Sequence, residues 1–239
     1  MNYVRVPNVT YHADGLVTSG KYAPFLDSPR FMAAYNKAIN SGHFIGGEKD
    51  VDLHIEWRVA IACWAAQHAT HLQGDFVECG VNTGILSLAV CEHVNFNSLN
   101  KTCYLFDTFA GIPESQISEN ERATRLISNT KYPDCYERTS ANFRDYPRVK
   151  LVRGMVPDTL STVKIEVVSY LSIDMNIAYP ERKAIEHFWP LLTSGAMVVL
   201  DDYGWVDYEE QRRTMDEFAE QVGVEVLALP TGQGLLIKP

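Results

Sequence analysis

The fold is decided by the stretch Asp75-Phe-Val-Glu-Cys-Gly-Val-Asn-Thr-Gly84. Its first residues are a short apolar run typical of a buried strand, and the run ends in the pattern Glu-x-Gly-x-x-x-Gly. The glycines allow a tight turn and a close approach between backbone and ligand before the next helix. The pyrophosphate-binding pattern Gly-x-Gly-x-x-Gly does not occur in this turn. A tight turn with a structural glutamate is an equally good interpretation of these residues alone.

Seven short runs rich in apolar and β-branched residues extend from this stretch to the end of the sequence. They span Asp75–Val81, Thr102–Asp107, Val149–Gly154, Val168–Asp174, Ala196–Asp201, Val224–Leu229 and Gly234–Lys238. Nearly continuous apolar strands with helices between them predict a buried, mostly parallel sheet. The sequence therefore predicts an α/β fold with a seven-stranded, doubly wound, Rossmann-like sheet.

The last two runs differ from the others because only Pro230-Thr-Gly-Gln233 separates them. Four residues are too few for a crossover helix, so these runs must pair as an antiparallel C-terminal hairpin.

The segment before the first strand predicts a helical extension at the N-terminus. Residues 1 to about 26 show no sustained period, and we expect an irregular arm or lid there. Asp27 or Ser28 can cap a first helix that has Pro29 in its first turn. A second helix is expected from about Leu53 to Leu72.

These features predict one domain with an extension. We expect residues 1–73 to form an arm and helices that cover the substrate, and residues 74–239 to form the ligand-binding core.

Composition excludes several classes of protein. The formal net charge of −9 repels phosphate backbones and anionic lipids, so we expect no nucleic-acid and no membrane partner. The five cysteines are widely spaced and include no Cys-x-x-Cys pair, which argues against a zinc site or a disulfide framework. The N-terminal residues lack the pattern of a signal peptide. We therefore expect a cytoplasmic protein.

Polar residues and glycine follow the second and third predicted strands. Asp107 ends the second strand, where a carboxylate can accept hydrogen bonds from both hydroxyls of a ribose. Capping of the following turn is the alternative role for Asp107. The third strand ends in Arg153-Gly-Met155, where the glycine leaves room for a flat ring and the methionine offers an apolar wall.

Three carboxylates follow the fourth and fifth predicted strands, namely Asp174, Asp201 and Asp202. Carboxylates this close raise one another's pKa unless a cation neutralises them. A site with oxygen ligands and no histidine or cysteine suits a hard ion, above all Mg²⁺. The alternative is that the pair Asp201-Asp202 caps a helix and that Asp174 forms an ion pair with a nearby basic residue.

Together these segments resemble the macrocin O-methyltransferase (TylF-type) family of class I methyltransferases that use S-adenosylmethionine (SAM). The similar stretches are Asp75–Val81, Leu105–Glu114, Gly154–Leu160 and Trp189–Gly204. The C-terminal hairpin also favours a SAM methyltransferase sheet over a dehydrogenase sheet. The resemblance implies Mg²⁺-dependent transfer of a methyl group from SAM to a hydroxyl of a small molecule, such as a sugar or a glycosylated natural product. It also implies a possible homo-oligomer.

The resemblance gives the candidate residues their roles. The expected SAM-binding residues are Glu78, Gly80, Thr83, Ser87, Asp107, Thr108, Gly154 and Met155. The expected metal ligands are Asp174, Asp201 and Asp202, with Asp174 also the candidate catalytic base.

The sequence departs from the family where the acceptor should bind. Family members usually carry Asp-x-Asp after the fourth strand, whereas this chain has Asp174-Met-Asn176. The following Ala178-Tyr-Pro-Glu181 also differs from the usual Tyr-Glu-Ser-Thr, so the macrolide sugar is not carried over as substrate. Two alternatives remain open: a metal-independent methyltransferase acting on another small acceptor, and a SAM-binding protein without catalysis.

Overall fold

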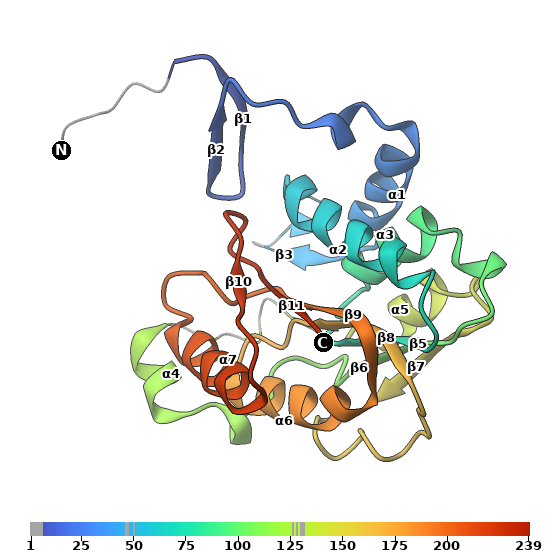
Figure 1. The fold of residues 1–239 in the computed structure, drawn as a ribbon, viewed down its shortest axis with the longest axis vertical. Helices are drawn as coiled ribbons and strands as arrows, with labels where there is room; N and C mark the ends of the chain where they lie inside the picture. The colour runs from blue at the N-terminus through green and yellow to red at the C-terminus, as the bar shows by residue number, and fades with distance from the viewer. Residues whose placement is uncertain (1–6, 46–47, 50, 126, 128, 130–131) are drawn as a thin grey trace.

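A computed structural model describes residues 7–45, 48–49, 51–125, 127, 129 and 132–239. Its centre is a seven-stranded sheet in the order β10-β11-β9-β8-β5-β6-β7 (Figure 1). The strands are β5 (Asp75–Cys79), β6 (Cys103–Asp107), β7 (Val149–Arg153), β8 (Val168–Ile173), β9 (Leu192–Leu200), β10 (Leu227–Ala228) and β11 (Gly234–Ile237). The predicted seven-stranded sheet is confirmed, and the strand positions agree within a few residues.

Strand direction also agrees with the prediction. Strands β5 to β9 pair with one another in parallel. Strand β11 is antiparallel to both of its neighbours, β9 and β10, which confirms the C-terminal hairpin. The chain winds from β5 outward to β7 and then returns to place β8 on the other side of β5. Ligands bind at such a switch point in α/β sheets, beyond the carboxyl ends of the strands.

Helices cover both faces of the sheet. The longer ones are α1 (Pro29–Ile39), α2 (Glu56–Ala69), α3 (Ile85–His93), α6 (Ala178–Phe188) and α7 (Glu209–Val222), and the shorter ones are α4 (Glu119–Thr124) and α5 (Tyr136–Asn142). Helices α1, α2 and α3 pack together on one face, and α6 and α7 pack on the other (Figure 1).

Alternation along the buried strands divides the core in two. On β5, Phe76 belongs to the cluster shared with α1, α2 and α3, while Val77 belongs to the cluster shared with α6 and α7. Successive side chains of a strand point to opposite faces of the sheet. When helices cover both faces, side chains on each face must be apolar. All six residues of β8 are buried, as a central strand of such a sheet requires.

The first helices of the N-terminal extension form as predicted. The side chain of Ser28 caps α1 by accepting a hydrogen bond from the backbone of Phe31, and Pro29 occupies the first turn. Helix α2 is shorter than expected, because it begins at Glu56 and ends at Ala69. A small antiparallel pair, β3 (Phe44–Ile45) and β4 (Glu48–Lys49), lies between the two helices.

The expectation of an irregular arm is wrong over residues 9–19, which form an antiparallel hairpin of β1 (Val9–Ala13) and β2 (Leu16–Ser19). Asp14 and Gly15 join the strands with φ angles of +50° and +72°. Asp-Gly is a favoured pair for this two-residue turn, because both positions need positive φ. The hairpin projects beyond the helices, with its turn directed back toward the rest of the molecule (Figure 1).

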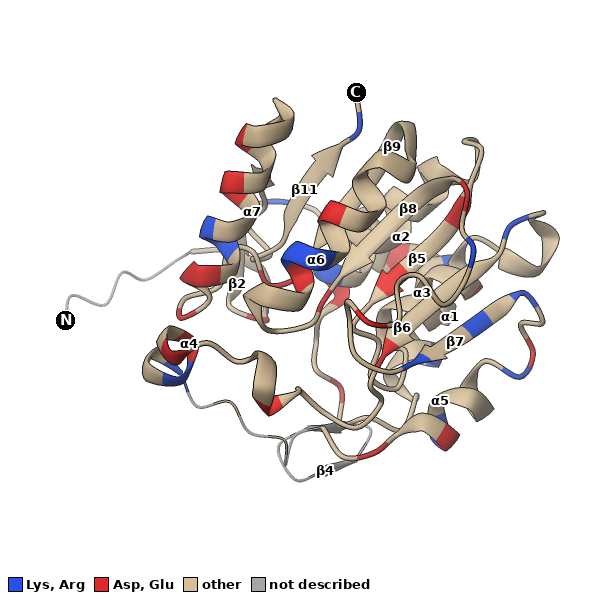
Figure 2. Cartoon of the chain, turned by 90° about the horizontal axis from the view of Figure 1, so that it is seen from below, with Lys and Arg blue, Asp and Glu red and all other residues tan. Residues whose placement is uncertain are grey.

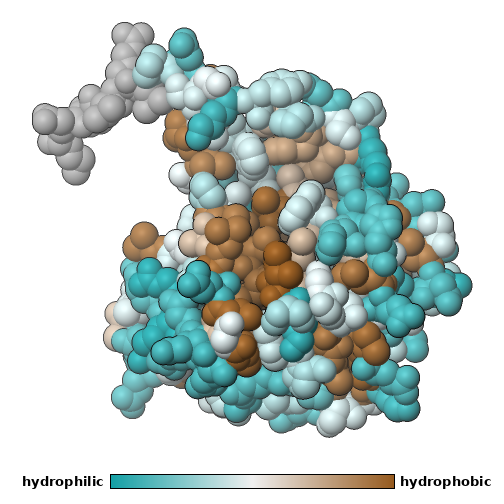
Figure 3. All heavy atoms as spheres, in the orientation of Figure 1, coloured by the Kyte–Doolittle hydropathy of each residue, from teal (hydrophilic) through white to brown (hydrophobic). Residues whose placement is uncertain are grey.

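The surface is mixed in charge. Figure 2 shows acidic residues spread over α4, α6 and α7, with basic residues among them. Figure 3 shows apolar residues gathered in the middle of one face, below the hairpin. Exposed apolar side chains of the C-terminal hairpin include Leu227 of β10 and Ile237 of β11. Among the described residues, none of the helices has the length and apolar character needed to cross a membrane.

Candidate functional site

A cavity of about 360 Å³ opens beyond the carboxyl ends of the central parallel strands. Its wall includes Glu78 after β5, Asp107 after β6, Gly154 after β7 and the acidic residues that follow β8 and β9. The fold therefore brings together residues that are up to 124 positions apart, from Glu78 to Asp202. This is the switch-point edge of the sheet.

Gly80 makes the junction between β5 and β8 possible. A Cβ atom at this position would lie 1.8 Å from the backbone oxygen of Asp174, far inside van der Waals contact. The residue also has a φ of +87°, a conformation that favours glycine. Its N–H donates a 2.9 Å hydrogen bond to the carbonyl of Phe106 on β6. Gly80 thus fixes the backbone of the turn against two neighbouring strand ends.

Glu78 is a buried carboxyl group at the cavity wall, with an exposed fraction of 3%. Burial raises its pKa to about 8, and the negative charges of Asp201 and Asp107 add to the rise. The hydroxyl of Ser87 donates a hydrogen bond to it. Ser87 itself lies behind the cavity wall, so its contact with a ligand would be through the position of Glu78. A cationic group entering the cavity would favour the ionised form of this glutamate.

Asp107 holds two turns together. One carboxylate oxygen accepts hydrogen bonds from the N–H groups of Val81 and Asn82, at 2.6 and 2.7 Å. The other oxygen accepts a 2.7 Å bond from the N–H of Phe109. Thr108 lines the cavity and donates its hydroxyl to the carbonyl of Gly111 at 2.6 Å. The turn-capping role considered for Asp107 is therefore present, and the oxygen that accepts from Phe109 still has room to accept a further bond.

The other expected SAM-binding residues lie in different environments. Gly154 lines the cavity and has a φ of +141°. Met155, next to it, is 39% exposed and is not part of the cavity wall. Thr83 is buried behind the wall, where its hydroxyl forms a 2.8 Å hydrogen bond with that of Ser41. Of the eight residues, five line the cavity, and Thr83, Ser87 and Met155 do not.

Asp174, Asp201 and Asp202 come together as expected. One oxygen from each carboxylate lies within 4.8 Å of one from each of the others. Burial and the two neighbouring carboxylates raise the pKa of Asp174 well above its ordinary value. Burial and the charge of Asp201 raise the pKa of Asp202 to about 7. The cluster thus carries unfavourable negative charge that a cation would relieve.

The donor set of this acidic triad fits a hard divalent cation. The Oδ2 atom of Asp202 is buried and has no hydrogen-bond partner among the described residues. Such an orphaned oxygen is costly unless something binds it. Asn176, which stands where the family usually has aspartate, also lines the cavity and lies 3.5 Å from Asp174, Nδ2 to Oδ1. Its own Oδ1 accepts from the hydroxyls of Tyr132 and Tyr208, each at 3.4 Å.

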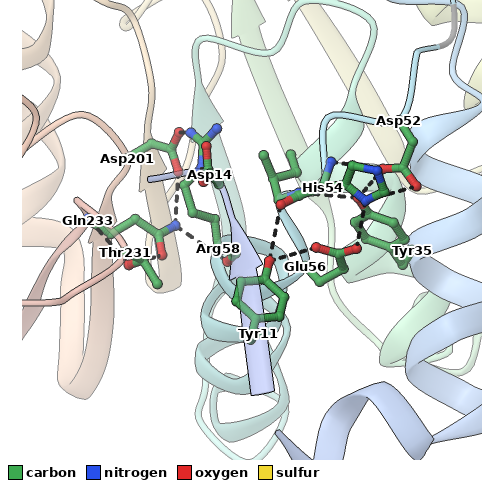
Figure 4. A network of polar contacts seen from close by, with 11 residues as sticks. Tyr11, Asp14, Tyr35, Asp52, His54, Glu56, Arg58, Asp201, Thr231 and Gln233 are labelled. Atoms are coloured by element: carbon green, nitrogen blue, oxygen red, sulfur yellow. Dashed lines mark hydrogen bonds and ion pairs between the residues drawn. The ribbon is translucent and has the colours of Figure 1, made fainter. Parts of the chain in front are cut away.

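Arg58 is a functional candidate that the sequence analysis missed. Its Nη1 lies 2.5 Å from Oδ2 of Asp201, and its Nε lies 2.8 Å from Oδ2 of Asp14 on the hairpin turn (Figure 4). The other oxygen of Asp201 accepts a 2.9 Å bond from Gln233, which precedes β11 (Figure 4). Arg58 belongs to an apolar helix and gave no motif, whereas the Asp-Gly turn signal could have placed Asp14 at a hairpin tip.

Glu181 was also missed as a supporting residue. It is buried and accepts hydrogen bonds from the backbone of Met175, at 3.1 Å, and from Gln211, at 3.0 Å. Burial raises its pKa to about 8, with a contribution from the charge of Asp202. Glu181 thereby fixes the segment that immediately follows Asp174.

The N-terminal extension contributes to the cavity wall through Asp14, Leu53, Ile55 and Arg58. Trp57, which belongs to the second helix of this extension, is not in the wall. Its ring packs edge-on against Phe25, with ring centroids 4.6 Å apart. The wall also carries the aromatic side chains of Tyr132, Trp205 and Tyr208, and the Trp205 ring lies 5.6 Å from Cζ of Arg58.

The chain is similar in sequence to one described family. The model of the macrocin-O-methyltransferase (TylF) family matches residues 59–227, which is more than half of the chain. A search of curated proteins finds no match.

Solved structures share the fold. The O-methyltransferase NovP superposes with a TM-score of 0.68 at 21% identity, over 76% of this chain and 79% of that chain. The calicheamicin methyltransferase CalS11 gives a TM-score of 0.59 at 17% identity, over 92% of this chain and 98% of that chain. Cofactor-bound Rv0187 from MTB gives 0.55 at 17% identity, over 90% and 94%. At these identities the similarity shows the fold alone.

Proposed function

Because the chain belongs to the macrocin O-methyltransferase (TylF) family and is therefore a SAM-dependent O-methyltransferase, we propose that its cavity binds SAM beside a divalent-cation site and methylates a hydroxyl of a small molecule. The observation that carries this proposal is the convergence of Glu78 and Asp107 with the acidic triad in one cavity.

Glu78, Gly80, Asp107, Thr108 and Gly154 are the residues we assign to SAM. SAM has an ammonium group that a buried carboxylate such as Glu78 can bind, and a ribose whose hydroxyls can donate to Asp107. Ser87 would act by holding Glu78 in position. The exposed Met155 and the buried Thr83 remain predictions with no support from their positions.

We assign the acidic triad to Mg²⁺. A divalent ion bound there would supply the positive charge that stabilises an acceptor hydroxyl as it loses its proton. Asp174 is the residue that would take this proton, because it is less buried than Asp201. The remaining task of the protein is to align the acceptor oxygen with the methyl group and sulfur, which is a matter of orientation.

The acceptor would bind beside the aromatic residues of the cavity wall. Tyr132, Trp205 and Tyr208 line the cavity and offer aromatic surface to an acceptor. CalS11 is described as a TDP-rhamnose 3'-O-methyltransferase, and the family takes its name from a macrocin methyltransferase. These names support a sugar hydroxyl or a glycosylated natural product as the acceptor class.

We expect a cytoplasmic enzyme, and a homo-oligomer remains a prediction.

A metal-independent methyltransferase is the second candidate, because one observation favours it. Arg58 already places a positive charge against Asp201 within the triad. If this guanidinium is the cation that the triad requires, methyl transfer would persist in the presence of a chelator.

The deciding experiment is calorimetric titration of the metal-stripped protein, first with SAM and then with Mg²⁺. We expect SAM binding that Asp107→Ala abolishes and Mg²⁺ binding that Asp201→Ala abolishes. Absence of SAM binding under both conditions would refute the proposed role of the cavity. SAM binding without Mg²⁺ binding would favour the metal-independent mechanism.

A further inference from the structure

Polar side-chain contacts at Tyr11 and at Asp14 attach the N-terminal hairpin to the rest of the molecule. Tyr11 is the one buried residue between Val9 and Ser19. Its hydroxyl donates to Oε2 of Glu56 at 2.7 Å (Figure 4). Its ring packs edge-on against Trp57. The hairpin therefore buries little apolar surface, and its second attachment, at the turn, must contribute much of what orients it.

The second attachment is the ion pair of Asp14 with Arg58. Both side chains are 18% exposed, and the side chain of Asp201 is 4% exposed. One guanidinium thus divides its donors between a carboxylate on the hairpin and a carboxylate of the triad (Figure 4). Charge pairs with so little solvent contact are screened less than surface pairs, so losing one partner has a larger effect.

We propose that Asp14 and Arg58 are positioning residues that link the docking of the hairpin to the binding of a divalent cation at Asp201. This inference rests on the proposed function in taking the triad as the cation site. The three residues come from the hairpin turn, from the first turn of α2 and from the end of β9. Tertiary structure alone brings them together, since Arg58 lies 44 positions after Asp14 and Asp201 lies 143 positions after Arg58.

The direction of the linkage follows from the charges. A divalent cation on Asp201 competes with Arg58 for that carboxylate and repels the guanidinium. Asp14 is then the carboxylate left to Arg58, so the pair at the hairpin turn becomes stronger. Gln233 still holds the other oxygen of Asp201 and keeps that side chain in place. Because linkage is reciprocal, a docked hairpin must favour cation binding by the same factor.

The first test follows hydrogen exchange of the backbone amides in residues 9–19 of the metal-free protein. Asp14→Asn should increase their exchange, because the hairpin loses its attachment at the turn. Asp14→Glu should restore much of the protection. His12→Gln is the matched control, since His12 is an exposed residue of the same hairpin. Equal exchange in wild type and Asp14→Asn would overturn the proposed attachment.

The second test measures Mg²⁺ affinity by calorimetry in the same proteins. Asp14→Asn should weaken binding on the order of tenfold, because Arg58 then competes for Asp201 without a second partner. Arg58→Gln should strengthen binding, because the competitor is gone, and Arg58→Lys should lie between Arg58→Gln and wild type. A merely structural role would weaken binding in both Asp14→Asn and Arg58→Gln. Weaker binding in both, or no change in either, would overturn the linkage.

Failure of this inference can be told apart from failure of the proposed function. Mg²⁺ should also slow the exchange of residues 9–19 in wild type but not in Asp14→Asn. If wild type binds SAM and Mg²⁺ while Mg²⁺ leaves the amide exchange of residues 9–19 unchanged, the linkage is wrong and the proposed function stands. If wild type does not bind Mg²⁺, the proposed cation site and the linkage are both refuted, and the metal-free exchange still decides the attachment at Asp14.

Discussion

The carboxylate of Asp107 accepts a 2.6 Å hydrogen bond from the backbone N–H of Val81, so the end of β6 holds the turn that follows the neighbouring strand. The same oxygen also accepts from the N–H of Asn82. Asp107 therefore shapes the proposed SAM-binding turn as well as facing the cavity. Loss of this carboxylate should therefore weaken ligand binding in two ways. It would disturb the turn after β5, and it would remove a group that faces the cavity.

Asp107→Asn should reduce SAM affinity by at least about tenfold and destabilise the protein by roughly 1–3 kcal/mol. Asparagine has one oxygen and one NH₂ group, so here the NH₂ group must face backbone N–H groups on one side. It cannot accept the hydrogen bonds that those N–H groups donate to Asp107. The measurements are calorimetric SAM titration and chemical denaturation. Asp75→Asn is the matched control, because Asp75 accepts a 2.7 Å bond from the N–H of Thr102 at the opposite end of β5. It should cost stability but leave SAM affinity unchanged, and an equal loss of affinity in both variants would contradict the assignment.

Glu78 should make the ligand-free protein less stable as the pH rises. Its pKa is raised from 4.5 to about 8, so the native state keeps this proton where the unfolded chain has lost it. The free energy of unfolding therefore falls between about pH 4.5 and pH 8 and levels off above that range. Glu78→Gln cannot ionise, so it should be more stable than wild type at pH 8 by roughly 1–3 kcal/mol while binding SAM more weakly. Denaturation curves from pH 5 to 8.5 that are parallel for the two proteins would refute this.

Gly80→Ala should be severely destabilising, by roughly 3 kcal/mol or more, because its Cβ would overlap the backbone of Asp174. Relief of that overlap requires the ends of β5 and β8 to move apart, which should also weaken Mg²⁺ binding. The control is Gly223→Ala, since Gly223 has a φ of +71° and a Cβ added there would have nothing within 4 Å. Backbone strain alone should cost about 1 kcal/mol there and leave Mg²⁺ affinity unaltered. Similar losses in both variants would mean that φ, and not the contact with Asp174, makes glycine necessary.

Asn176→Asp should raise Mg²⁺ affinity about tenfold, because it adds a fourth carboxylate oxygen donor beside Asp174. The hydroxyls of Tyr132 and Tyr208 can still donate to the new side chain. In metal-free buffer the same variant should melt at a lower temperature than wild type, because it places another negative charge in the triad. Calorimetry and thermal melts with and without Mg²⁺ check both effects. Unchanged affinity would place residue 176 outside the reach of the cation.

The sheet could be predicted because its strands are buried on both faces. Continuous apolar runs such as Val168–Ile173 mark a strand without any knowledge of its neighbours. The strand ends then identified the triad, because parallel strands bring their carboxyl ends to one edge. The family match over residues 59–227 extends beyond the stretches that showed the resemblance.

The N-terminal hairpin had a weaker signal, in its Asp14-Gly15 turn, and Arg58 had none. The residues of β1, Val9-Thr-Tyr-His-Ala13, do alternate between apolar and polar side chains, but the run is short and only Tyr11 is buried. Arg58 lies in a helix whose neighbours are apolar, and its role depends on contacts with residues 44 and 143 positions away. Such a role arises only from tertiary structure. The separation of Ser87 and Thr83 from the cavity wall likewise depends on which way the first turn of α3 faces.

The close contact of Gly80 with Asp174 bears on how this protein could acquire new acceptors. Backbone atoms, and not side chains, set the separation between the turn after β5 and the proposed base. Substitutions in side chains therefore have little power to alter that separation, whereas the segments that carry Tyr132, Trp205 and Tyr208 can change without moving it. Selection can thus vary the recognition of acceptors independently of the reacting geometry, which would let one scaffold diversify while its chemistry is inherited intact.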